Sequence, residues 1–199
     1  AKITGKINVI KSLFEKVDNL IIGGGMAYTF IKAMGGSIGK SLVEDEKIPL
    51  AKQIIKDAKT KGVILFLPTD SLNANDFNND ANTNLSNVAN IENDFMGIDI
   101  GPESIALFSN IIKKSKTIIW NGPMGVFEME KFENGTKKIG EAICLATENG
   151  AFSLVGGGDS VAAVKKFNLE ERVSYISTGG GAMLEYLKGK RLPGVVAIL

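Results

Sequence analysis

The apolar residues of the chain follow two spacings that take turns along its length. Short continuous apolar runs are typical of strands buried on both faces, whereas apolar residues three and four positions apart are typical of helices that bury one side. The first pattern predicts strands at residues 20–22, 63–67, 95–100, 116–120, 152–155 and 172–176. The second predicts helices at residues 8–17, 26–34, 49–60, 101–114, 132–149, 159–167 and 181–188.

Strands and helices therefore alternate through most of the chain. This order indicates an α/β fold with a doubly wound, mainly parallel sheet and helices on both faces, a Rossmann-like three-layer arrangement. Residues 1–199 suffice for one sizeable core and are predicted to form a single domain. Two segments lie outside the alternation. Residues 1–6 are predicted to belong to a loop, and the Asn- and Asp-rich residues 73–93 to be surface loop or irregular β-structure.

Charge and cysteine content exclude several classes of partner. Lys plus Arg number 23 and Asp plus Glu number 22, and the resulting net charge of +1 argues against nucleic-acid binding through bulk charge. No apolar run approaches the roughly 20 residues of a membrane-spanning helix, so no membrane association is expected. The single cysteine, Cys144, excludes an internal disulfide and favours a cytoplasmic location. Its apolar neighbours at helical spacing predict a buried side chain rather than a nucleophile.

The chain contains no histidine, which removes several catalytic mechanisms. A Ser-His-Asp triad, a Cys-His pair and a histidine-based zinc site cannot form, and one cysteine cannot make a thiolate metal site. Carboxylate, lysine, backbone and oxygen-bound metal chemistry remain. These suit phosphoryl transfer, in which the protein mainly positions groups and neutralises charge.

Three consecutive glycines follow a short apolar run at three places, residues 23–25, 156–158 and 179–181, and a predicted helix follows each. Glycine lets the backbone approach a ligand closely, and the helix N-terminus beyond it offers unpaired N–H groups and a partial positive charge. The carboxyl ends of parallel strands share one edge of a sheet, so the three junctions are predicted to form an anion site suited to phosphate there. Tight turns without a ligand are the alternative explanation.

A further glycine-rich segment, residues 35–41, is similar to a Walker A loop but departs from that motif. Only three residues separate Gly35 from Gly39 where four are needed, and the segment follows a predicted helix instead of a strand. We therefore interpret it as a helix end followed by a loop.

With these motifs in view, the sequence resembles the phosphoglycerate kinase family, specifically its carboxyl-terminal, nucleotide-binding half. The resemblance covers essentially all 199 residues. Six motifs carry it: AKITGKI at 1–7, IIGGGMAYTF at 21–30, MGIDIGPES at 96–104, WNGPMGVFE at 120–128, GGGDS at 156–160 and STGGGA at 177–182. It implies reversible phosphoryl transfer between 1,3-bisphosphoglycerate and Mg-ADP, giving 3-phosphoglycerate and ATP, by a monomeric cytoplasmic enzyme of glycolysis.

The resemblance also implies roles for individual residues. Lys2 and Lys6, with Ala1 beside them, match the segment that contacts the nucleotide phosphates and the migrating phosphoryl group, and a mobile ammonium suits a charge that moves. Asp159 matches the aspartate that holds the nucleotide's Mg²⁺, with ordinary helix capping as its alternative role. Glu128 matches the glutamate that hydrogen-bonds the ribose. The remaining matches are Gly24, Gly25, Gly97 and Ile98 in the adenine slot; Asn121, Pro123, Gly157, Gly158 and Ser160 along the nucleotide cleft; and Thr178, Gly179 and Gly180 at a helix end facing the transferred group, with Gly180 counted beside Lys2 and Lys6 as catalytic.

Some features depart from the family pattern. Gly5 stands where an aspartate is common, which removes a carboxylate that could order Lys6, and Ser160 replaces the usual threonine but keeps its hydroxyl. The family's amino-terminal half, with its arginine-rich site for 3-phosphoglycerate, has no counterpart, since Arg172 and Arg191 are the only arginines. The strand that precedes residue 1 in the family is also missing, and a gap or exposed edge in the sheet is expected.

Two functions follow from these observations. The chain is expected to bind Mg-ADP or Mg-ATP as one half of a kinase, to reach the phosphoglycerate substrate only through the other half, and to be inactive alone. A nucleotide-binding regulatory module of unrelated function is one alternative, because one fold can serve many functions. A bare scaffold or degradation product with no retained function is the other.

Overall fold

Helices and strands follow one another in the order that the apolar pattern predicts. The computed structural model describes residues 3–189, with side-chain environments from residue 5 onward. Its helices are α1 (Ile3–Leu13), α2 (Gly25–Ala33), α3 (Ile48–Thr60), α4 (Pro102–Lys114), α5 (Asn134–Glu148), α6 (Gly158–Lys166) and α7 (Gly180–Leu187), with single 3₁₀ turns at Asp45–Lys47, Glu130–Phe132 and Glu170–Arg172. Its strands are β1 (Asn19–Ile21), β2 (Ser37–Ile38), β3 (Ile64–Phe66), β4 (Asp70–Ala74), β5 (Thr83–Asn87), β6 (Asn90–Ile91), β7 (Met96–Ile100), β8 (Thr117–Trp120), β9 (Phe152–Gly156) and β10 (Tyr175–Ser177).

The helices from α2 onward begin and end within two residues of their predicted bounds, whereas α1 does not. Residues 3–6, predicted as loop, form its first turn, and it ends at Leu13 instead of continuing to residue 17. The chain closes the helix with a turn in which Val17 donates its N–H to the Leu13 carbonyl at 3.0 Å. Phe14 and Val17 still pack on the apolar cluster beneath, which explains why the apolar spacing outlasts the helix.

The bounds of α4 have a clear local cause. Pro102 and Glu103 occupy its first turn and two lysines its last, as the helix dipole favours. Asp70, at the start of β4, accepts the N–H groups of Glu103 at 2.9 Å and Ser104 at 2.8 Å. This capping of α4 by Asp70 joins the helix to the antiparallel sheet that contains β4.

The strands form four small sheets within residues 3–189 rather than one continuous sheet. Parallel pairing joins β1 to β3, β8 to β9, β9 to β10, and β2 to β6, whereas β4 pairs antiparallel with β5 and β7. The predicted α/β class and the parallel pairings of its main strands are therefore confirmed. The antiparallel pairing of β7 corrects the assignment of residues 95–100 to the parallel series, and residues 73–93 contain regular strands as well as loop.

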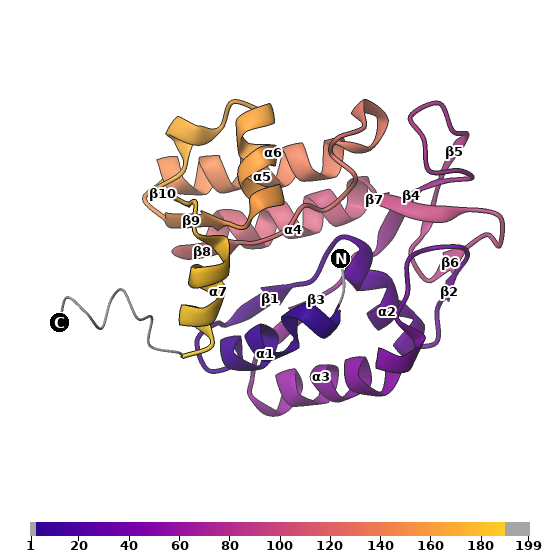
Figure 1. Ribbon diagram of the computed structural model, residues 1–199, viewed down its shortest axis with the longest axis horizontal. Helices are drawn as coiled ribbons and strands as arrows, with labels where there is room; N and C mark the ends of the chain where they lie inside the picture. Colours follow the sequence, from indigo (N-terminus) through magenta and orange to yellow (C-terminus); the bar gives the residue numbers. More distant parts are fainter. Residues whose placement is uncertain (1–2, 190–199) are drawn as a thin grey trace.

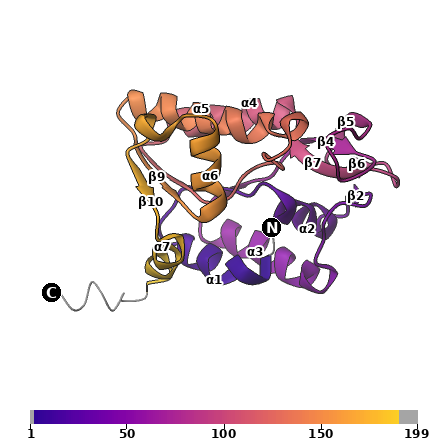
Figure 2. The same cartoon turned by 45° about the horizontal axis from the view of Figure 1, so that its top comes forward.

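Helices lie on both sides of the main parallel strands. Figures 1 and 2 place α4 and α5 on one side and α1 and α3 on the other. The first side forms an apolar cluster that includes Phe108, Cys144 and Val155, and the second one that includes Phe30 and Ile54, all fully buried. Cys144 is buried as predicted, and burial raises the pKa of its thiol.

The glycine clusters at residues 23–25, 156–158 and 179–181 lie at the carboxyl ends of β1, β9 and β10, as predicted. The glycine-rich segment that is similar to a Walker A loop, residues 35–41, follows the end of α2 and contains β2, with Gly35 at a φ of +95°. Within residues 3–189, no helix is long and apolar enough to cross a lipid bilayer.

Candidate nucleotide site

A pocket of about 290 Å³ lies where two helices begin. The first turns of α6 and α7 both line it. Their loops touch backbone to backbone: a Cβ on Gly180 would lie 2.6 Å from both Cα and N of Gly157. Gly157 also has a φ of +96°, a conformation that residues with a side chain rarely adopt. Two adjacent helix N-termini therefore direct their positive ends at one small space, which suits a phosphate group.

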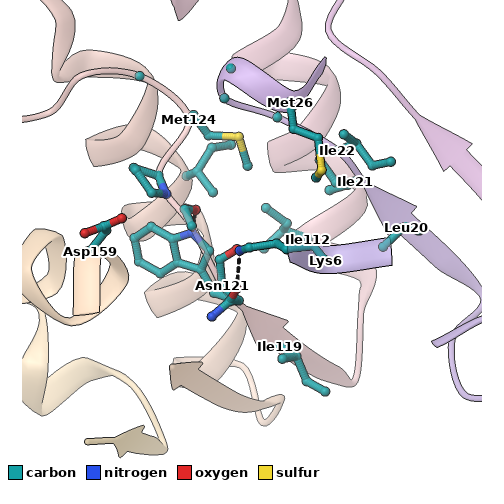
Figure 3. A pocket seen from close by; sticks show the side chains of 18 of the residues that line it. Lys6, Leu20, Ile21, Ile22, Met26, Ile112, Ile119, Asn121, Met124 and Asp159 are labelled. Carbon is teal, nitrogen blue, oxygen red and sulfur yellow. Dashed lines mark hydrogen bonds between the residues drawn. The ribbon is translucent and has the colours of Figure 1, made fainter. Parts of the chain in front are cut away.

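Lys6 adds a positive charge to this pocket from α1. Its Nζ donates to the backbone carbonyl of Asn121 at 3.2 Å and to the side-chain Oδ1 of the same residue, as Figure 3 shows. Asn121 is fixed in turn, because its Nδ2 donates to the Gly156 carbonyl at 2.6 Å. Burial lowers the pKa of Lys6, and the charge of nearby Asp159 raises it. Asn121 thus performs the ordering role that the missing carboxylate at Gly5 could have supplied.

Asp159 is an exposed carboxylate in the first turn of α6 that lines the same pocket. The N-cap position of α6 belongs to Gly157, so Asp159 is not the capping residue. Within the described residues, no three His, Cys, Asp or Glu side chains are grouped to hold a metal ion by themselves. One carboxylate nevertheless fits Mg²⁺, which commonly takes one or two protein carboxylates and completes its shell with phosphate oxygens and water.

The phosphate-sized pocket adjoins a much larger cavity of about 1620 Å³ that Lys6, Asn121 and Asp159 also line. Other residues proposed from the sequence line this cavity, namely Gly24, Gly25, Gly97, Ile98, Pro123 and Glu128. The loops after β1 and β8 meet here, since a Cβ on Gly24 would lie 2.9 Å from the carbonyl oxygen of Pro123. Glu128 is exposed.

Most of the residues proposed from the sequence therefore gather around two adjoining spaces, with some exceptions. Thr178 and Gly179 precede α7 but line neither space. Ser160 lines the small pocket and is fully buried, and its hydroxyl accepts the N–H of Gly122 at 2.6 Å. Ala1 and Lys2 lie outside the described residues.

Two buried residues next to the site escaped the sequence reasoning. Asp99 of β7 accepts the N–H of Gly135 at 2.7 Å and that of Ile100 at 2.8 Å, and burial raises its pKa to about 7 in spite of these bonds. Thr136 accepts two N–H groups of the loop after β8, from Met124 and Gly125, each at 3.1 Å. A charged residue inside the apolar run at 95–100 is the one signal that could have marked Asp99.

Comparison with known proteins connects this site to one family. A family model described as phosphoglycerate kinase matches residues 1–190. The chain is 58% identical to "Phosphoglycerate kinase" of Porphyromonas gingivalis over 198 residues, covering 100% of this chain and 47% of the relative, and 54% identical to that of Chloroherpeton thalassium, covering 100% and 50%. The chain thus spans about half the length of the curated relatives it matches.

Solved structures agree with the sequence relatives. Phosphoglycerate kinase from Coxiella burnetii superposes with a TM-score of 0.93 at 44% identity, over 98% of this chain and 49% of the other. The enzyme from Pyrococcus horikoshii OT3 superposes with a TM-score of 0.82 at 27% identity, over 100% and 49%. The backbone arrangement around the two cavities is therefore one that much longer kinases also contain.

Proposed function

The chain belongs to the phosphoglycerate kinase family, and from this premise we propose that it is the carboxyl-terminal, nucleotide-binding half of such an enzyme. In this proposal it binds Mg-ADP and Mg-ATP during reversible phosphoryl transfer with 1,3-bisphosphoglycerate. The phosphoglycerate side of the reaction would lie in polypeptide outside these 199 residues. Since transfer needs both substrates aligned in one water-excluded cleft, the chain would bind nucleotide without turnover.

The observation that carries this proposal is the convergence of α6, α7 and Lys6 on one pocket. Two helix N-termini and an ammonium group supply N–H donors and positive charge from three separate elements. A polyphosphate carries negative charge on several adjacent oxygens, and it would contact all three at once. The Lys6 ammonium would exchange its contacts with Asn121 for phosphate oxygens, and its long side chain would let it follow a phosphoryl group as the charge moves between donor and acceptor.

The adjoining cavity would receive the nucleoside. The adenine ring would lie among Gly24, Gly97 and Ile98, where thin backbone leaves room for a flat ring, and Pro123 would close the slot. Glu128 would accept hydrogen bonds from the ribose hydroxyls. Asp159 would ligate the Mg²⁺ that comes with the nucleotide, and the ion would neutralise charge on the phosphate oxygens.

A calorimetric titration with ADP, with and without Mg²⁺, tests the nucleotide site. We expect saturable binding that Mg²⁺ strengthens, and we expect Asp159→Ala to remove most of that strengthening. Without Mg²⁺ the variant should bind ADP as well as the parent chain or better, because a carboxylate repels the phosphates. This opposite behaviour in the two conditions separates loss of a metal ligand from general damage to the pocket.

Glu171→Ala is the matched control, because Glu171 is an exposed carboxylate in the 3₁₀ turn after α6 that does not line either cavity. It should retain the full response to Mg²⁺. A folded parent chain that does not bind ADP would contradict the proposed function. An Asp159→Ala variant with an unchanged response to Mg²⁺ would contradict only the metal assignment.

We also propose that the parallel pair β1–β3 and the parallel sheet β8–β9–β10 are parts of one doubly wound, three-layer sheet, with a strand missing between β1 and β8. The larger cavity follows both strands along their whole length, and neither pairs on that side within residues 3–189. Its volume of about 1620 Å³ exceeds the roughly 300–1,000 Å³ of typical ligand pockets. Apart from Lys6 and Lys114, the side chains that α1, α4 and α5 present to the cavity are apolar, as a strand buried on both faces requires.

The backbone alternation identifies which amides such a strand would pair with. Ile22 donates to the Phe66 carbonyl of β3 at 3.0 Å, so the N–H of Ile21 faces the opposite way, toward the cavity. On β8, Phe152 donates to the Lys116 carbonyl at 2.9 Å, so by the same alternation the N–H of Ile119 faces the cavity. The N–H groups of Leu20 and Ile118 face β3 and β9 instead, and their exchange rates serve as internal references.

Amide hydrogen exchange tests the missing strand. We would place six alternating valines and isoleucines and two glycines before residue 1, and compare this extended chain with one that carries two prolines in the added strand. Exchange at Ile21 and Ile119 should slow by roughly a hundredfold relative to Leu20 and Ile118 in the first chain only. Equal exchange rates at Ile21 and Ile119 in both extended chains would contradict the proposal. So would the finding that dimerisation of the 199-residue chain already protects these two amides.

A further inference from the structure

The loop at residues 121–128, here called the cleft loop, carries several residues of the proposed nucleotide site. Asn121 fixes Lys6, Pro123 faces Gly24, and Glu128 would contact the ribose. A loop with these tasks must hold one shape, yet it contains no helix or strand. The source of its rigidity is therefore a functional question, and this inference rests on the nucleotide site proposed above.

The two ends of the cleft loop are held by bonds to neighbouring elements. At its start, Gly122 donates to the Ser160 hydroxyl at 2.6 Å. Toward its end, Val126 donates to the Ile98 carbonyl at 3.2 Å, and the Lys166 ammonium donates to the Phe127 carbonyl at 2.6 Å. These contacts leave the middle of the loop, residues 123–125, to be held by something else.

Thr136 holds this middle part. Its Oγ1 accepts the N–H groups of both Met124 and Gly125 at 3.1 Å, and its side chain is fully buried. No other partner for these two N–H groups is recorded within residues 3–189. Buried N–H groups without an acceptor are costly, so the hydroxyl fixes the loop at the position where Pro123 meets Gly24.

Asp99 holds Thr136 in place. It accepts the N–H of Gly135, the residue before Thr136, at 2.7 Å and so fixes the first turn of α5. It also packs directly against Gly125, where any Cβ would collide with the carboxylate and would lie 2.6 Å from the Phe132 carbonyl oxygen. The cleft loop is therefore both packed against Asp99 and hydrogen-bonded to Thr136.

We propose that Thr136, anchored through Asp99, is a positioning residue that holds the cleft loop in the shape required for the nucleoside end of the nucleotide. Thr136 touches neither cavity and contacts no ligand itself. The phosphate end, built from Lys6 and the first turns of α6 and α7, has its own supports in Asn121 and Ser160. Loss of the Thr136 hydroxyl should therefore affect one end of the ligand and not the other.

The test compares Thr136→Val, which keeps the shape but removes the acceptor, with Thr136→Ser, which keeps the hydroxyl. Calorimetry with Mg-ADP and with Mg-pyrophosphate, which lacks the nucleoside, reports on the two ends separately. We expect Thr136→Val to bind ADP about tenfold or more weakly, because the buried N–H of Met124 and the partly buried N–H of Gly125 lose their acceptor. Its pyrophosphate affinity should stay within about twofold of the parent, and Thr136→Ser should restore ADP binding.

Each other outcome contradicts the inference in a recognisable way. Equal ADP affinity of Thr136→Val and the parent means that the hydroxyl does not position the loop. Parallel losses for ADP and pyrophosphate mean that Thr136 supports the fold in general. Should Thr136→Val fail to fold, Thr136→Ala measured below its melting temperature replaces it under the same criterion. If the parent binds pyrophosphate but not ADP, the proposed nucleoside site is wrong, which is a distinct result.

Discussion

Replacing Gly180 by alanine is expected to damage both stability and nucleotide binding, because its Cβ has no space. It would lie 2.6 Å from the Cα and N of Gly157, and backbone atoms cannot rotate away as a side chain can. The loops before α6 and α7 would have to separate. We expect a loss of about 2 kcal/mol in the free energy of unfolding, as for other over-packed sites. Since both helix N-termini would then no longer face one pocket, ADP affinity should fall by at least roughly tenfold.

Urea denaturation and ADP titration of Gly180→Ala would measure the two effects, with Gly181→Ala as the matched control. Gly181 is the next residue of the same turn, it is exposed, and a Cβ there would meet nothing within 4 Å. The control should keep parental stability; because Gly181 itself lines the small pocket, the comparison between the two variants is made on stability. If both variants are destabilised equally, the backbone contact with Gly157 is not what aligns the two helices.

The sequence predicts those parts of the fold that depend on local pattern. Runs such as residues 152–155 and helical spacing such as that of α3 are decided by neighbours in the chain, and the structure places them as predicted. The end of α1 was mispredicted because Phe14 and Val17 pack on the core from a turn, and apolar spacing alone cannot distinguish that from a helix. Likewise, nothing local in β7 reveals that its partner is the antiparallel strand β4.

The candidate site divides in the same way. Glycine clusters at strand ends could be read directly, because chain connectivity alone brings those ends to one edge of the fold. The support of Lys6 by Asn121 joins residues 115 positions apart, and the contact between Asp99 and Gly135 joins residues 36 apart. Such pairs follow from tertiary packing, which the amino-acid pattern of either segment does not encode. The residues proposed to touch the ligand could therefore be named from the sequence, whereas those that hold them in place could not.

Replacing Lys6 by methionine is expected to abolish most nucleotide affinity while leaving the fold intact. The Lys6 ammonium faces a pocket formed by two helix N-termini, and it would form charge-assisted hydrogen bonds with the phosphates. Such bonds contribute about 1.5–3 kcal/mol, which corresponds to roughly a 10- to 150-fold loss of ADP affinity. Stability should change little, because methionine suits a helix. Burial lowers the pKa of Lys6, which means that it disfavours the charged form, so removing the charge costs little stability.

The same titration of Lys11→Met separates a local effect from a change in net charge. Lys11 lies on the same helix, is exposed, and lines neither cavity, so this variant loses one positive charge without losing a ligand contact. It should keep ADP affinity within about twofold of the parent. The ADP affinity of Lys6→Arg should lie between those of Lys6→Met and Lys11→Met, because a guanidinium keeps the charge but is larger and more rigid in its geometry. Parental affinity in Lys6→Met would mean that Lys6 only supports Asn121, and that the helix N-termini alone hold the phosphates.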